Sequence, residues 1–405
     1  MVKGYYCKGT VTNTEDILDF ANMVFSMSYK SVDFAKFLPK AYSDERCNIP
    51  IHHIIKESEK IKALIDVYPV NIRQFKSENS VDCEIKAAYI GTVCVHPNSR
   101  GKGYMIELMQ KAEQQAREAG CDMMMLDGTR HRYQNYGFER AGMKYNFNIE
   151  YDNLRHCCSR LYDEYEQSVY SFEVIEKDSI YLDEMYDLYM RRNVIARSRE
   201  DFYLCLKSNY SEVYAVLKDD AFAGYINISA GETNIHETEL KNASEMPKII
   251  YDLFDELGLD EIGITVGIDE VENIEWLNKM SDYYTIGMSH QIKILNYENV
   301  LKFLFKWKQR YCDISDGRYI IGVLINGSDK NNIQKNYCIE IVNKEVSVLE
   351  TDIQISDIVL EERELVLLLT TSYCLHEQNK KDTRLLNSPK GWFPLPFFLP
   401  EADAF

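Results

Sequence analysis

Basic charge is scarce in this sequence. Its 46 lysines and arginines are outnumbered by 64 aspartates and glutamates, so the formal net charge is −18. Proteins that bind nucleic acid need clustered basic side chains for the phosphates, so this balance argues against nucleic acid as a partner. An acidic cleft that attracts a cationic substrate would fit the charge, and so would a surface that only confers solubility.

Signals for export, membrane insertion and metal binding are also missing. Residues 1–5 lead directly into domain sequence without the pattern of a signal peptide, and the apolar run at 365–369 is far too short to span a bilayer. The 11 cysteines are scattered and form no CxxC pair, which indicates neither a disulfide framework nor a zinc site. We therefore expect a reduced, cytoplasmic protein with no membrane partner and no metal.

The most informative segment that is present is an apolar strand-like run, a basic turn and the start of a helix. The strand-like run ends with Val93, Cys94 and Val95, and the turn consists of Arg100, Gly101, Lys102 and Gly103. Turn amides beside a helix N-terminus form an anion site. The two glycines remove the Cβ atoms that would block a phosphate, and the two basic side chains add positive charge. The alternative is a glycine-rich turn without a ligand.

Two common phosphate loops do not fit this turn. A Walker loop needs Ser or Thr after its lysine, and a dinucleotide fingerprint needs a third glycine. What remains is Arg100-x-x-Gly103 after a strand and a proline. It resembles the pyrophosphate loop of GNAT-family N-acetyltransferases, which hold acyl-coenzyme A. The resemblance implies that the strand end, the turn and Tyr104 bind the cofactor, although Met105 replaces the Gly or Ala of the general pattern.

A second segment follows after one expected helix and a short buried strand at residues 121–126. Its pattern is Tyr133-x-x-x-Gly137-Phe138. The pattern resembles the second GNAT motif, a short helix that leads to a strand past the thioester end of coenzyme A. Two motifs in this order are much more specific than either alone.

The length of the chain predicts several domains of the α+β class. We expect a first GNAT-like domain at residues 1–165, a second at 166–296 and a third unit at 297–405. The second unit repeats the order of strands and helices of the first, including a strand at 286–295. Residues 237–246 contain neither glycine nor arginine, so we expect a degenerate copy without a phosphate loop.

The third unit combines an amphipathic helix at residues 300–311, strands and a helix at 362–374. By pattern alone it resembles a sterol-carrier-protein-like domain. The chain then ends with bulky apolar residues and prolines over residues 391–405, whereas solvated termini are usually polar. This predicts a packed tail, which either caps its own domain or delivers the Phe405 carboxylate to a site.

The whole chain resembles the enhanced-intracellular-survival (Eis) acetyltransferases, in which the loop ends in a bulky apolar residue such as Met105. The resemblance implies acetyl-CoA as co-substrate, an amine acceptor of the aminoglycoside, polyamine or protein-lysine type, and a hexamer. It also implies that Tyr133 is the general acid and that the terminal carboxylate of Phe405 is the general base. Backbone donors at residues 93–95 would stabilise the oxyanion.

Other readings of the residues near these motifs stay open. His96 and His131 flank the motifs, and for His96 a structural role is the simpler reading. Cys94 and Cys121 fit small buried apolar residues better than an acyl-cysteine intermediate. Asp127 either orients a cationic substrate or caps the following turn. For the whole protein, the leading hypothesis is an N-acetyltransferase acting on a cationic small molecule through a ternary complex. The alternatives are a protein-lysine acetyltransferase and a non-catalytic acyl-CoA or lipid-binding protein.

Overall fold

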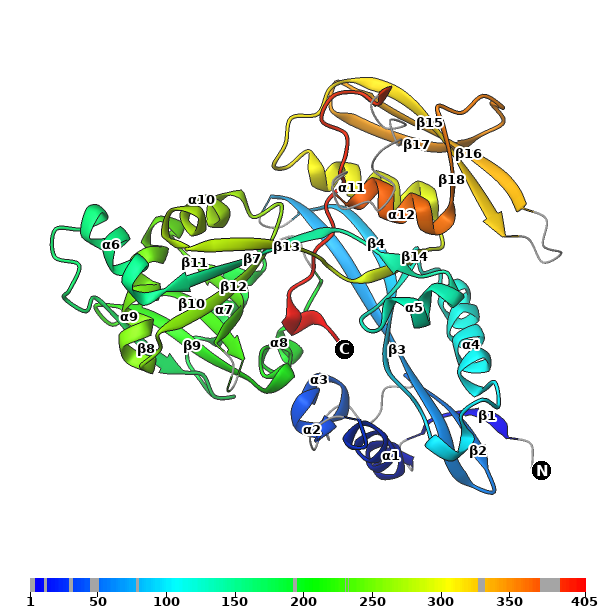
Figure 1. The fold of residues 1–405 in the computed structure, drawn as a ribbon, viewed down its shortest axis with the longest axis horizontal. Helices are drawn as coiled ribbons and strands as arrows, with labels where there is room; N and C mark the ends of the chain where they lie inside the picture. The colour runs from blue at the N-terminus through cyan, green and yellow to red at the C-terminus, as the bar shows by residue number, and fades with distance from the viewer. Residues whose placement is uncertain are drawn as a thin grey trace.

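The fold contains three β-sheets with helices packed against them (Figure 1). The computed structural model describes residues 4–10, 13–28, 32–43, 51–77, 80–191, 195–229, 231, 233–326, 332–371 and 387–405. Strands and helices mix in every unit, which confirms the expected α+β class. Among the described residues, no helix combines the length and the apolar character needed to cross a membrane.

The first sheet has seven strands and helices on both faces. In order across the sheet they are β1 (Tyr5–Lys8), β2 (His52–Glu57), β3 (Lys60–Ser77), β4 (Ser80–Val95), β5 (Met123–Leu126), β14 (Gln291–Ile294) and β6 (Glu139–Arg140). Helix α1 (Thr14–Ser26) packs on one face and α4 (Tyr104–Glu118) on the other, because alternate residues of β3 and β4 point to opposite sides. Two short helices follow α1 in the chain, α2 (Phe34–Phe37) and α3 (Pro39–Tyr42).

Strands β4 and β5 separate at one end. They pair in parallel from Ala87 opposite Met123 to Ile90 opposite Leu126, where β5 ends. The last residues of β4 continue to Val95 while paired with β3. One edge of β4 therefore extends beyond β5 over residues 91–95, and its backbone groups on that side are available to a ligand.

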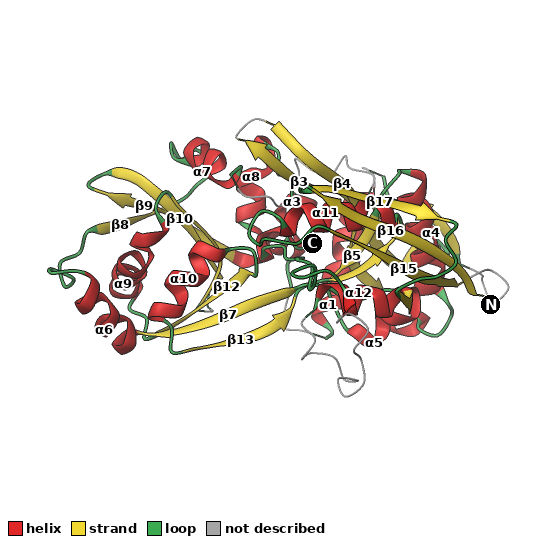
Figure 2. Ribbon diagram, turned by 90° about the horizontal axis from the view of Figure 1, so that it is seen from above, coloured by secondary structure: helices red, strands yellow, loops and turns green. Residues whose placement is uncertain are grey.

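The second sheet also has seven strands. Their order is β13 (Tyr283–Met288), β7 (Met143–Glu150), β12 (Glu261–Gly267), β11 (Asn234–Leu240), β10 (Ala221–Ser229), β9 (Ser211–Lys218) and β8 (Tyr170–Val174). Figure 2 shows α6 (Tyr151–Leu161), α9 (Met246–Leu257) and α10 (Val271–Met280) on one face, and α7 (Leu182–Tyr189) and α8 (Arg199–Leu206) on the other. Where the first unit has its glycine turn, this unit has the short 3₁₀ turn Ala243–Glu245, without a left-handed residue in its described backbone.

The two large sheets exchange strands. The prediction of one strand over residues 286–295 is wrong, because the chain divides at Ser289 and His290 into β13 and β14. Strand β14 crosses into the first sheet between β5 and β6, while β7 lies in the second sheet between β12 and β13. The division between the sheets therefore does not coincide with residue 165 or residue 296. Periodicity along the chain carries no information about which sheet a strand joins.

The third unit contains a four-stranded sheet and two helices. The strand order is β17 (Glu345–Thr351), β16 (Asn332–Val342), β15 (Gly317–Asn326) and β18 (Ile358–Glu361). Helices α11 (Tyr297–Lys308) and α12 (Glu362–Thr370) lie between this sheet and the first sheet (Figure 1). The helix expected at 362–374 is observed to Thr370, and residues 372–374 lie outside the described part of the chain.

The C-terminal tail leaves the third unit and runs between the two large sheets, where the chain ends (Figures 1 and 2). Its large side chains are buried, namely Trp392, Leu395, Phe397, Phe398 and Leu399. Gly142 has a φ of +68°, and a Cβ built on it would lie 1.6 Å from the Phe397 carbonyl oxygen. The tail therefore passes directly over the end of the second sequence motif.

Candidate active site

A cavity of about 600 Å³ opens where β4 extends beyond β5. Its lining combines the C-terminal end of α1, the end of β4, the basic turn and α5 (Arg130–Tyr133). The lining residues are Val24, Phe25, Ser28, Val93, Cys94, Val95, Ser99, Arg100, Gly101, Gly103, Tyr104, Met105, Ile106 and Arg132. The structure thus brings most of the sequence-predicted cofactor residues to a single cavity.

The turn has the backbone that an anion site requires. Gly101 and Gly103 have φ values of +78° and +85°, a region that favours glycine. A Cβ at either position would have no other atom within 4 Å, so both face open space in which a phosphate fits. Gly103 directly precedes α4, whose first N–H groups and dipole favour a negative charge at this point.

Lys102 differs from the expectation that it adds charge to the anion site. Its ammonium group donates a hydrogen bond to Glu57 Oε1 over 2.7 Å, and the Tyr104 hydroxyl donates to the same carboxylate oxygen. These contacts lower the pKa of Glu57, with the Lys102 hydrogen bond as the largest cause. The side chain of Lys102 is therefore turned toward β2, and Arg100 is the basic residue of this turn that lines the cavity.

Replacing Arg100 should weaken coenzyme binding more than replacing Lys102. We expect Arg100→Gln to raise the Kd for coenzyme A about tenfold, because a charge-assisted contact to a phosphate is lost. Lys102→Gln should change it less than about twofold, since Glu57 already neutralises that lysine. Isothermal titration with coenzyme A measures both variants, and equal effects would contradict the assignment.

Tyr133 lies at the inner end of this region. It is 4% exposed and packs against Phe138 and Gly128. Burial raises the pKa of its phenol, and Arg132 partly opposes this effect. Cys94 is also close enough to raise this pKa. Its neighbour Arg132 and Cys94 line the cavity, whereas Tyr133 itself is not among the lining residues.

Phe405 ends beside the free edge of β4. Its ring stacks on Tyr68 with centroids 4.0 Å apart and contacts Tyr89 at 5.4 Å. A Cβ built on Gly91 would lie 3.1 Å from the Phe405 carbonyl oxygen, so the chain end packs closely against Gly91. Phe405 therefore lies against β4 at Gly91, a residue close in sequence to Val93 and Val95, which line the cavity.

Asp127 makes two contacts that the sequence did not indicate. It accepts a hydrogen bond of 2.9 Å from the Tyr89 hydroxyl and lies 3.1 Å from His290 Nε2. Burial acts to raise its pKa, but His290 and Tyr89 outweigh burial and the pKa is lowered. Asp127 thus supports Tyr89, one of the two rings that contact Phe405.

A buried cluster around Asp66 was not predicted. Asp66 is fully buried and accepts hydrogen bonds from the hydroxyls of Tyr42 and Tyr68, while His52 Nδ1 lies 2.6 Å from its other oxygen. The Tyr42 hydroxyl oxygen in turn accepts a hydrogen bond from the Thr92 hydroxyl over 2.9 Å. Tyr68 carries the stacked Phe405 ring, so this cluster fixes the support on which the tail ends. Its members are dispersed between residues 42 and 92, and no spacing in the sequence indicates them.

Lys40 is a second residue that sequence analysis missed. It lies on α3, is 4% exposed, and donates a hydrogen bond to the Ala402 carbonyl oxygen over 2.7 Å. Its ammonium group also lies 4.1 Å from the centroid of the Phe405 ring. Burial lowers the pKa of Lys40 to about 8, and Asp403 partly opposes this effect. The first unit therefore holds the tail with a lysine that loses its charge in mildly basic solution.

Lys40→Met is expected to remove part of the pH dependence of stability. The pKa of Lys40 is about 8 in the folded chain and 10.5 ordinarily, so the unfolded state binds more protons between these values. The free energy of unfolding of the wild type therefore rises relative to the variant, by about 2 kcal/mol from about pH 7.5 to 9.5. Urea unfolding at the two pH values measures this gain. Lys36→Met, at an exposed lysine, is the control and should show no such change.

The remaining candidates have structural roles. His96 Nδ1 accepts a hydrogen bond from the Asn98 amide and caps the turn Pro97–Ser99. Cys94 is buried, and burial raises the pKa of its thiol well above the usual range, which disfavours the thiolate that a nucleophile needs. In the part of the chain that the structure describes, no group of three His, Cys, Asp or Glu residues could hold a metal ion.

Comparison with known proteins agrees with this geometry. Residues 8–141 match the family model described as "Acetyltransferase (GNAT) domain". A search of curated proteins gives no match. Eis1 from Mycobacterium abscessus has a similar structure, with a TM-score of 0.64 and 13% identity over 99% of this chain and 100% of that chain.

Two further solved structures share this fold. A GCN5-related N-acetyltransferase from Anabaena variabilis ATCC 29413 gives a TM-score of 0.63 at 15% identity, with 91% and 90% of the two chains covered. One from Kribbella flavida gives 0.61 at 12%, with 90% and 88% covered. At such identities these structures establish the fold, whereas the family match covers the cavity-forming unit itself. The chain therefore carries a GNAT acetyltransferase domain over residues 8–141 and is an acyl-CoA-dependent acetyltransferase.

Proposed function

We propose that the protein transfers an acetyl group from acetyl-CoA to an amine of a cationic small molecule, by direct attack in a ternary complex. The observation that carries this proposal is the position of Phe405. The Phe405 carboxyl group lies beside Gly91, two residues before Val93, the first residue of β4 that lines the cofactor cavity. A free alkylamine is protonated at neutral pH and needs such a base to lose its proton before attack.

The cofactor would be held by this chain's own backbone and Arg100. The amides of the turn and of α4 face the pyrophosphate, and the thioester lies along Val93, Cys94 and Val95. Acetyl-CoA supplies the activated acyl group. Backbone N–H groups at the free edge of β4 stabilise the negative charge that develops on the thioester oxygen.

The proton transfers follow from the two flanking groups. The amine nitrogen forms a bond to the thioester carbon, and its proton passes to the Phe405 carboxylate directly or through a water. When the carbon–sulfur bond breaks, the leaving thiolate takes a proton from the Tyr133 phenol. Both groups then exchange protons with solvent, so the step is balanced without a metal or an acyl-enzyme.

The acceptor class rests on charge and on the resemblance to Eis proteins. A net charge of −18 favours a polycation, and an aminoglycoside or polyamine has several amines of the required kind. We further propose three units along the chain at residues 1–165, 166–296 and 297–405, of which the first two exchange β7 and β14. The last would have a sterol-carrier-like fold, and the protein would form a hexamer in the cytoplasm.

A thiol-release assay with acetyl-CoA and a panel of polyamines, aminoglycosides and lysine peptides tests the proposal. We expect turnover that depends on a small polycationic amine. Acetylation restricted to protein lysines, seen as mass shifts on proteins, would favour a protein-lysine acetyltransferase instead. Tight acyl-CoA binding without turnover on any amine would favour a non-catalytic binding protein and count against the proposal.

A further inference from the structure

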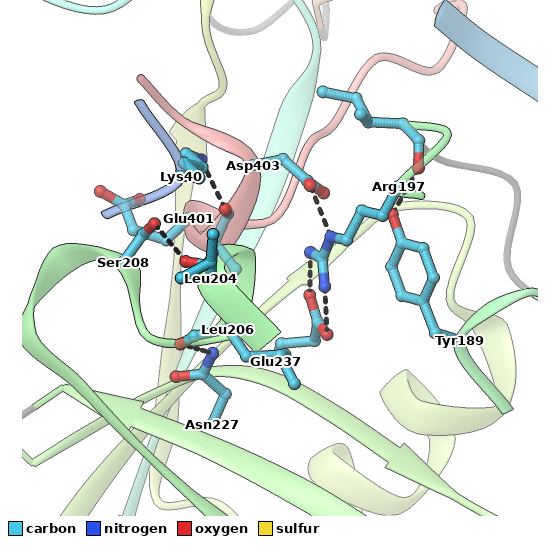
Figure 3. A network of polar contacts seen from close by, with 12 residues as sticks. Lys40, Tyr189, Arg197, Leu204, Leu206, Ser208, Asn227, Glu237, Glu401 and Asp403 are labelled. Atoms are coloured by element: carbon cyan, nitrogen blue, oxygen red, sulfur yellow. Dashed lines mark hydrogen bonds and ion pairs between the residues drawn. The ribbon is translucent and has the colours of Figure 1, made fainter. Parts of the chain in front are cut away.

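A buried ionic cluster joins the tail to the second unit (Figure 3). Arg197 donates hydrogen bonds from Nη1 and Nη2 to the two carboxylate oxygens of Glu237, over 3.0 and 2.5 Å. Its Nε donates to Asp403 Oδ1 over 2.7 Å. The side chains of Arg197 and Asp403 are each 1% exposed, and that of Glu237 is fully buried. A single guanidinium thus connects β11 of the second unit to a residue two positions before the chain end.

The geometry of this cluster is fixed on every side. The Tyr225 hydroxyl donates to Glu237 over 2.6 Å, and the Arg197 guanidinium lies 4.1 Å from the centroid of the Tyr189 ring. The planar guanidinium supplies three parallel donors to two carboxylates, an arrangement that lysine cannot reproduce. Two carboxylates against one guanidinium leave one excess negative charge, which Lys40 offsets from the first unit.

Residues 401–405 connect the ionic cluster to the terminal carboxylate, so the position of Asp403 limits where the carboxylate can lie. Residues 401–403 form a 3₁₀ turn, in which the Asp403 amide donates to the Pro400 carbonyl over 2.9 Å and the Ala404 amide to the Glu401 carbonyl over 3.0 Å. Asn209 of the second unit donates to the Glu401 carbonyl over 2.8 Å. Two extended residues span at most about 7 Å, so a fixed Asp403 confines the terminal carboxylate.

We propose that Arg197, held by Glu237, is a positioning residue that fixes the C-terminal carboxylate through Asp403. The second unit, which has no phosphate loop of its own, then contributes to catalysis by anchoring the tail. This inference rests on the proposed role of the Phe405 carboxylate as general base. Misplacing a catalytic group by about 1 Å can cost about a hundredfold in rate, so an anchor of this kind affects kcat.

The variant Asp403→Ala tests the contact between Arg197 and the tail without disturbing the Arg197–Glu237 pair. Arg197 keeps its bidentate partner Glu237, so no buried guanidinium is left unpaired, and only the link to the tail is removed. We expect kcat to fall about 30-fold or more while the KM for acetyl-CoA changes less than about twofold. Asp403→Asn, whose carbonyl oxygen still accepts from Arg197 Nε, should recover much of the rate. Arg199→Met, at an exposed arginine paired with Asp183 and Asp187, is the matched control and should leave kcat unchanged.

A double-mutant cycle separates positioning from general stability. In a chain that lacks residue 405, Asp403→Ala should have no further effect on kcat, because the terminal carboxylate is then on Ala404 and has already left the position that Arg197 fixes. An equal fall in both backgrounds, or no fall in the full chain, would overturn the inference. If removal of residue 405 alone leaves kcat unchanged, the role of the carboxylate in the proposed function fails instead. Should Asp403→Ala not fold, Glu237→Gln, which loosens Arg197 and leaves Asp403 in place, is carried through the same cycle with the same criteria.

Discussion

Moving the terminal carboxylate is expected to lower kcat by about a thousandfold. Appending one alanine after Phe405 keeps the ring that stacks on Tyr68 but places the carboxylate about 3.5 Å further along the chain. Deleting residues 401–405 removes the group altogether. Both variants should bind coenzyme A as the wild type does, because the turn at Arg100 and the residues of the tail belong to different parts of the fold.

The measurement is steady-state kinetics by thiol release, together with titration of coenzyme A. Phe405→Leu provides the matched control, since it retains the carboxylate and changes only the ring; its kcat should fall by much less than that of the extended chain. An extended chain that retains the wild-type kcat would show that the carboxylate is not the base. Loss of coenzyme binding in the deletion would show that the tail supports the fold of the cavity.

Tyr133→Phe should lower kcat by about a hundredfold, with little change in either KM. The phenol is buried, and burial raises its pKa, so it is protonated across the neutral range and can donate to the leaving thiolate. Removing only the hydroxyl keeps the packing against Phe138. The effect should be smaller with an acyl thioester whose thiol is more acidic, because its thiolate needs less assistance to leave.

Tyr136→Phe is the control for this variant. Tyr136 lies in the 3₁₀ turn Gln134–Tyr136 that follows α5, and burial raises its pKa as well. Its ring is only partly buried, whereas that of Tyr133 is buried. We expect less than about a twofold change in kcat. Equal losses in the two variants would assign the effect to packing of this segment.

The sequence predicted secondary structure well where neighbouring residues determine it. The strand, turn and helix from Val93 to α4 are each determined by neighbouring residues, as are the left-handed glycines and the helix end at Gly120. The burial of the tail also followed from its own composition.

The partners of the charged residues could not be predicted in this way. Lys102 pairs with Glu57, 45 residues earlier, and Arg197 pairs with Asp403, 206 residues later. Neither spacing corresponds to a helix turn or a strand register, so only the folded chain reveals these pairs. The sequence could not predict that β14 belongs to the first sheet for the same reason.

The exchange of β7 and β14 also orders events during synthesis. The ribosome releases the GNAT match at residues 8–141 early, but β14, between β5 and β6, emerges only with residues 291–294. Until β14 has been synthesised, β5 and β6 each have one unpaired edge. Such exposed strand edges favour aggregation. Residues 8–141 produced alone would keep the glycine turn and still lack the strand that joins β5 to β6. The first two units are thus intertwined and must be completed together, and the tail lies between them (Figure 1).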